Sequence, residues 1–177
     1  MESLEQRWRQ YERGRFPAED LADLVHDIGE SPLLNRQPVR GELLRLLSNP
    51  DALVRQNALG ALAYHGMAVD WQTEFGKQLL SGMDLMLRLD EDRDCRRQAA
   101  AAFGSLFKST KSQSVIGALG RVCSNPDEES DVRAFAYTSL LNVAGIPLRE
   151  QPNPVGLMLG PREMAELSRV LASYSEG

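Results

Sequence analysis

The chain has 177 residues, of which 42% are apolar and 25% are charged, and its formal net charge is −5. These values are ordinary for a globular protein that buries a core, and the acidic balance disfavours non-specific binding to nucleic-acid phosphates. No run of about 18 apolar residues predicts a membrane span, and the polar N-terminal segment is unlike a signal peptide, so we expect a cytoplasmic protein.

Two amphipathic helices are predicted at the beginning of the chain. Residues 2–15 place Leu4, Trp8 and Tyr11 on one side of a largely polar helix. A second helix begins near Pro17, because proline is favoured in a first helical turn.

Six further helices are predicted as three pairs, at 38–48 and 52–65, 71–89 and 93–108, and 112–124 and 130–144. A stretch rich in proline and glycine, Ile146 to Pro161, then breaks the helical pattern. An amphipathic helix at 162–173 closes the chain, and no strand is predicted.

The motif V-R-x-x-A-x-x-A-L at 54–62 recurs in weaker form, with intervals of 41 and 37 residues between the arginines Arg55, Arg96 and Arg133. A repeat near 40 residues is typical of stacked helical pairs. The first copy's offsets 0, 4, 7, 8 and 11 share one helix face, which therefore predicts the core stripe. The predicted stripes include Val54, Ala58, Ala61, Leu62 and His65, then Cys95, Ala99, Phe103 and Leu106, then Val132, Ala136, Leu140 and Val143.

Acidic or turn-forming residues precede each arginine by six and by four positions. These are Asn49, Asp90 and Asp127, and then Asp51, Asp92 and Glu129. Such residues cap helix N-termini, so each arginine is expected to pair with a carboxylate of its own repeat or of the next one.

The chain resembles the HEAT-repeat family through these motifs, including Asn49-Pro50-Asp51 and Asn125-Pro126-Asp127 before the arginine-bearing helices. The resemblance implies an all-α, right-handed α-solenoid with capping helices at both ends. It also implies one domain over 1–177, composed of capping helices 1–36, repeats 37–69, 70–110 and 111–145, and a loop with a capping helix at 146–177. Members of the family are mostly scaffolds and adaptors, and a few are enzymes.

Catalytic and metal-binding patterns are not evident in the sequence. His26 and His65 are expected to be structural, and Cys95 and Cys123 fall on apolar helix faces, where free buried thiols are expected. The acidic runs lack the glycine and glutamate spacing of calcium loops. We therefore predict no cofactor, no metal and no catalytic residue.

A partner-binding surface is predicted on the second helix of each pair, opposite the core stripe. The HEAT resemblance places this face on the concave side, where small residues would let a peptide approach closely. The predicted contact residues are Gln56, Arg97, Tyr137 and Thr138, with an acidic rim of Asp92, Asp94, Glu128 and Glu129. Large residues that could anchor a partner are Trp8, Tyr11, Tyr64, Trp71 and Tyr137.

The leading hypothesis is a non-catalytic protein-binding scaffold whose partner is another protein and not nucleic acid or membrane. One alternative is an immunity-type protein that neutralises a bacterial toxin, because an acidic surface can cover a basic nuclease groove. The other is a HEAT-like lyase or isomerase for bilins. The sequence makes no prediction of oligomeric state.

Overall fold

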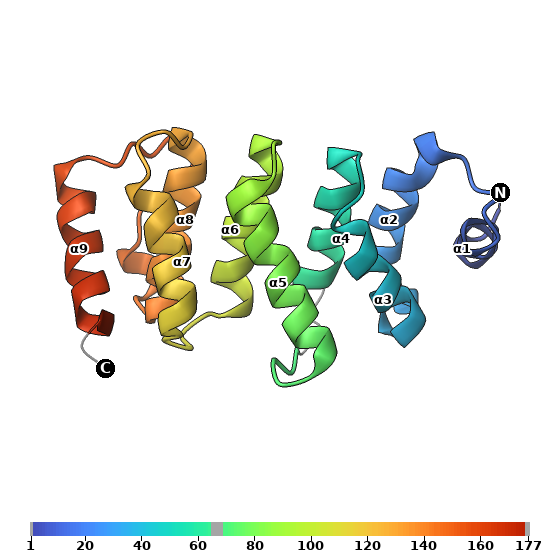
Figure 1. Cartoon of the computed structure of the whole chain (residues 1–177), viewed down its shortest axis with the longest axis horizontal. Coiled ribbons are helices and arrows are strands. Elements are labelled where there is room, and N and C mark those ends of the chain that lie inside the picture. Colours follow the sequence, from blue (N-terminus) through green and yellow to red (C-terminus); the bar gives the residue numbers. More distant parts are fainter. Residues whose placement is uncertain (1, 65–68, 176–177) are drawn as a thin grey trace. The chain divides into compact units, whose positions relative to one another are not determined.

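The computed structural model describes residues 2–64 and 69–175, and every regular element within these ranges is a helix. The chain forms two compact units, Met1–Gly82 and Met83–Gly177, and the boundary between them falls inside helix α5, Glu74–Leu89 (Figure 1). We describe each unit by itself.

Unit 1 begins with α1, Leu4–Glu12, whose N-terminus has a capping box between Ser3 and Gln6. A 3-10 turn, Ala18–Asp20, leads into α2, Leu21–Gly29, and a second one, Pro32–Asn35, leads into α3, Gln37–Leu46. The unit continues with α4, Ala52–Tyr64, which packs against both α2 and α3.

Unit 2 contains α6, Arg93–Leu106, α7, Gln113–Ser124, and α8, Ser130–Ala144. A short 3-10 turn, Leu148–Glu150, lies in the loop before α9, Pro161–Ser175. Helix α8 packs between α6 and α7, and α7 also contacts α9 (Figure 1). The buried centre of the unit is therefore α8.

The predicted core stripes are confirmed for the residues that the structure describes. Val54, Ala58, Ala61 and Leu62 of α4 are buried, as are the corresponding residues of α6 and α8, with Leu106 only half-buried. His65 lies outside the described residues. Most helix boundaries differ from the predicted ones by about three residues or fewer, because caps and tertiary packing decide the last turn. Helix α2 begins at Leu21 and not near Pro17, since the 3-10 turn Ala18–Asp20 precedes it.

The turns before the arginine-bearing helices share one local structure. The side-chain oxygens of Asn49, Asp90 and Asn125 each accept a hydrogen bond from the backbone N–H two residues later, at 2.9, 2.9 and 3.1 Å. In the third turn Asp127, six residues before Arg133, donates its backbone N–H to Asn125. That turn is longer by two residues than the others, and Asn125 takes the role.

The repeated arginine binds the backbone of the turn that precedes its helix. Arg55 Nη1 donates to the carbonyls of Asn49 and Pro50 at 2.8 and 3.0 Å. Arg96 Nη1 donates to the carbonyls six and five residues earlier, at 2.8 and 3.2 Å, which is the same arrangement. Arg133 Nε instead donates to the carbonyl of Cys123 at 2.9 Å.

The crossing of α6 and α8 depends on Gly104. A Cβ atom at this position would lie 2.6–2.8 Å from Oγ, Cβ and Cα of Ser139 on α8, so the two helices could not keep their separation. Gly104→Ala is expected to lower the free energy of unfolding by about 1–2 kcal/mol, because the strain of overpacking exceeds the gain in helix propensity. Urea unfolding followed by circular dichroism measures this change.

Gly117→Ala on α7 is the matched control, because the nearest atom to its added Cβ would be an Arg121 nitrogen 3.8 Å away. It should raise stability by up to ~1 kcal/mol. Equal effects of the two substitutions would contradict the close helix contact at Gly104.

Candidate functional site

The predicted binding face of unit 2 contains a cavity of about 550 Å³ between α6, α8 and the loop that follows α8. Small side chains form its floor, since Ala101 and Gly104 face Thr138 and Ser139 there. This volume lies within the range of ligand pockets in proteins, about 300–1,000 Å³. We call it the α6/α8 groove.

The groove has its outer wall in the loop 146–160, which folds back over α8. Helix α8 ends at Gly145 in the left-handed conformation, with φ of 85°, so the chain reverses there. Gln151 Nε2 then donates to Asn142 Oδ1 at 3.0 Å and to the Ile146 carbonyl at 2.7 Å. Two prolines flank the wall, Pro152 and Pro154.

One end of the groove is formed by Phe135, whose ring lies 5.4 Å from the Arg97 guanidinium carbon. Arg97 also pairs with Asp94 at 3.2 Å, so its charge is balanced locally. The charged residue that lines the groove is Lys108, which is exposed and has no ion pair within the described part of the chain. The groove therefore has a positive edge.

The predicted acidic rim is largely engaged within the protein. Arg96, the arginine of the second repeat, donates to Glu128 at 3.0 and 3.1 Å and also to Glu129, which confirms for this copy a pairing with the next repeat. Burial raises the pKa of Glu128, whose side chain is 11% exposed. Asp92 caps α6 by accepting from the Cys95 amide at 2.9 Å. These carboxylates hold helices and turns together.

Tyr137 is not on an exposed surface, in contrast to its predicted role as a contact residue. Its side chain is fully buried, and its hydroxyl donates to Glu166 on α9 at 2.5 Å. Burial and the neighbouring carboxylate raise the pKa of Tyr137. The Tyr137 side chain lies beneath the elements that pack on α8. This helix is covered on more sides than the pattern of stacked helical pairs predicts.

The structure brings together only part of the predicted surface. Thr138 lines the groove, although it is only 7% exposed and its hydroxyl donates to the Ala134 carbonyl at 3.2 Å. Gln56 belongs to unit 1, where it is half-buried. Ala134 and Leu141, which lie four residues before and three residues after Thr138 and so share its face of α8, are also buried.

Of the large residues predicted as possible anchors, Trp8 is buried and Tyr64 is 45% exposed. Tyr11 and Trp71 are half-buried. None of these residues lines the α6/α8 groove.

Both cysteines are buried free thiols, as predicted. Burial raises the pKa of Cys123 to about 12, so its thiol stays protonated and unreactive near neutral pH. Within residues 2–64 and 69–175, no cluster of three or more histidine, cysteine, aspartate or glutamate side chains is placed to hold a metal ion. No helix in these ranges is both long and apolar enough to cross a bilayer.

Sequence reasoning missed the residues that give the groove its shape. Phe135, Lys108, Asn142 and Gln151 line it, and none of them belongs to the predicted core stripes or to the predicted contact residues. The sequence feature that corresponds to the outer wall is the proline- and glycine-rich stretch from Ile146 to Pro161. Such a stretch predicts where a helix ends, but it does not predict the path of the chain that follows.

Comparison of the chain with protein-family models, with curated proteins and with solved structures finds no match. The resemblance to HEAT repeats therefore stays a prediction based on the motifs of this chain.

Proposed function

We propose that this protein is a non-catalytic binding module that captures an extended, acidic segment of a partner protein in the α6/α8 groove. The observation that carries the proposal is the groove itself, with a floor of small side chains, an aromatic end at Phe135 and a positive edge at Lys108. The proposal includes the predicted right-handed solenoid of HEAT-like pairs with capping helices, which would present such second-helix faces to a partner.

The small floor favours an extended segment. Ala101, Gly104 and Thr138 project little from the two helices, so a peptide backbone can approach closely and place an apolar side chain between them. Polar groups of Asn142 and Gln151 lie at the wall, where they can accept or donate hydrogen bonds to a peptide main chain. Lys108 supplies charge complementarity for a carboxylate of the segment.

The two alternative functions have no specific support among the described residues. An immunity protein would need a broad acidic surface, but Glu128, Glu129 and Asp94 pair with arginines of this chain. A bilin lyase that acts through a thiol would need an accessible cysteine, and Cys95 and Cys123 are buried. A partner protein in the cytoplasm remains the proposed setting.

A random peptide library displayed on phage and selected against the full chain tests the groove. Selected peptides should share an acidic residue next to apolar ones, and Ala101→Trp should weaken their binding by about tenfold or more, because an indole would fill the groove. Fluorescence anisotropy with labelled peptides measures the affinity. Lys108→Gln should reduce the preference for the acidic residue.

Ala165→Trp is the matched control, because Ala165 is exposed on α9 of the same unit and does not line the groove. It should leave the affinity unchanged. Peptides that bind wild type and Ala101→Trp equally well would show that the α6/α8 groove is not the binding site.

A further inference from the structure

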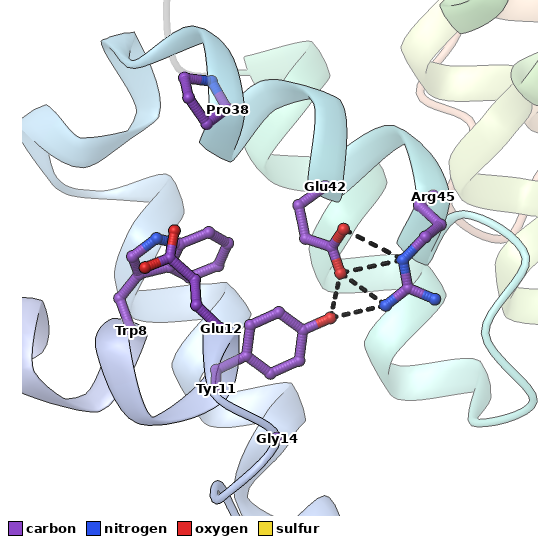
Figure 2. A pocket seen from close by; sticks show the side chains of 7 residues that line it. All are labelled: Trp8, Tyr11, Glu12, Gly14, Pro38, Glu42 and Arg45. Atoms are coloured by element: carbon purple, nitrogen blue, oxygen red, sulfur yellow. Dashed lines mark hydrogen bonds and ion pairs between the residues drawn. The ribbon is translucent and has the colours of Figure 1, made fainter.

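Unit 1 has a second pocket, of about 570 Å³, between the C-terminal half of α1 and helix α3. Figure 2 shows Trp8, Tyr11 and Glu12 on the α1 side of this pocket, with Pro38, Glu42 and Arg45 on α3. The lining therefore combines aromatic rings with carboxylates. None of these residues lines the α6/α8 groove.

The aromatic side of the pocket is fixed in position. The rings of Trp8 and Tyr11 lie 5.3 Å apart between centroids, at an interplanar angle of 34°. The Tyr11 hydroxyl donates to Glu42, and Arg45 Nη2 donates to the Tyr11 oxygen at 2.7 Å. Tyr11 thus cannot turn away from the pocket without breaking two hydrogen bonds (Figure 2).

The two carboxylates of the pocket have different surroundings. Arg45 Nε donates to both oxygens of Glu42, at 2.9 and 3.0 Å, and these hydrogen bonds lower the pKa of Glu42. Burial and the hydrogen bond to Glu42 raise the pKa of Tyr11 to about 12, so the phenol remains neutral. Glu12 is exposed, and no hydrogen bond or ion pair of its carboxylate occurs within the described residues.

The charges of the lining residues leave a net negative pocket. Glu42 and Arg45 neutralise each other, and the neutral Tyr11 phenol adds no charge, so Glu12 supplies one uncompensated carboxylate beside aromatic rings. Aromatic faces attract cations through the ring quadrupole, and a nearby carboxylate adds direct attraction. An anion would be repelled by Glu12, because the cation of the lining, Arg45, is already paired with Glu42.

We propose that this pocket binds an organic cation, the guanidinium or ammonium group of a basic ligand, between Glu12 and the half-buried Tyr11 ring, which packs on the buried Trp8. Arg45 acts as a positioning residue, because its hydrogen bonds hold Glu42 and Tyr11 in place and leave Glu12 to meet the ligand. The site is separate from the proposed peptide groove, so either proposal can fail without the other.

The fluorescence of Trp8 reports binding directly once the other tryptophan is replaced, so the full chain with Trp71→Phe is the test protein. N-acetyl-arginine amide is the probe, and N-acetyl-citrulline amide is its neutral counterpart of nearly the same shape. The arginine compound should give a saturable change in emission at concentrations where the citrulline compound gives none. Equal responses to the two compounds would overturn the proposal.

Glu12→Gln tests the charge at this site, and Glu19→Gln, an exposed residue outside the pocket, is its matched control. Glu12→Gln should lower the affinity for N-acetyl-arginine amide by about fivefold or more, and Glu19→Gln should leave this affinity unchanged. Both variants change exposed side chains, so folding is preserved and circular dichroism verifies it. An unchanged affinity in Glu12→Gln contradicts the assignment.

Two arms of the same titration identify the source of the cation. A short peptide with one arginine that binds at least tenfold more tightly than the amide indicates a basic side chain of a partner protein. Equal affinities of peptide and amide indicate a small-molecule cation. Both results support the site, and absence of any saturable response to either cationic ligand overturns it.

Discussion

Replacing Phe103 by alanine is expected to lower the free energy of unfolding of unit 2 by about 3–5 kcal/mol, through lost burial and the cavity that remains. Phe103 is 1% exposed on α6, and its ring packs 5.9 Å from that of Phe107 between centroids. The adjacent helix α8 is itself fully buried at several positions, so little room exists for the site to collapse. Urea titration followed by the helical circular dichroism signal measures the loss.

Phe135→Ala is the matched control for this prediction, since the same side chain is lost from α8 of the same unit at a half-buried position. Its cost should be about 1 kcal/mol, in proportion to the smaller apolar area that it buries. If the two substitutions lower the free energy of unfolding equally, Phe103 does not lie on the buried face of α6.

Replacing Arg96 by methionine is expected to cost about 2–4 kcal/mol, because Glu128 would keep its burial and lose its cation. The Arg96 and Glu128 side chains are only 13% and 11% exposed. Arg96 also donates to the carbonyls of Asp90 and Glu91, which the variant would leave without that donor. The change acts on two turns of the unit at once, and thermal or urea unfolding detects it.

Arg88→Met provides the comparison, because Arg88 pairs with Asp84 on the surface of α5 with 44% of its side chain exposed. That substitution should cost at most about 0.5 kcal/mol. The double variant Arg96→Met, Glu128→Gln should recover part of the loss, since no unpaired charge then stays buried. A cost for Arg96→Met no larger than that for Arg88→Met would show that the Arg96 pairs are solvated and contribute little.

The sequence by itself determined the helices and their inner faces. Spacings of 4, 7, 8 and 11 residues place Val54, Ala58 and Leu62 on one side of a helix whatever the rest of the chain does, and the structure buries all three. The turns could also be predicted from the sequence, because the side chains of Asn49 and Asp90 accept a hydrogen bond from the backbone N–H two residues later and need no distant partner. Local geometry is sufficient for such features.

The tertiary structure alone decided the candidate sites. Tyr137 has a sequence position suited to an exposed face, but α9 covers it and supplies Glu166 as its hydrogen-bond acceptor. The acidic rim was predicted as part of a partner-binding surface, but Glu128 pairs with Arg96 of this chain, at a separation of 32 residues.

The same holds for the two cavities, whose walls come from distant parts of the chain. The loop around Gln151 closes the α6/α8 groove, and Tyr11 reaches Glu42 across 31 residues to shape the pocket in unit 1. Helical periodicity shows which side of a helix is apolar. It carries no information on which distant element covers the other side, because that choice depends on packing between segments that are far apart in sequence.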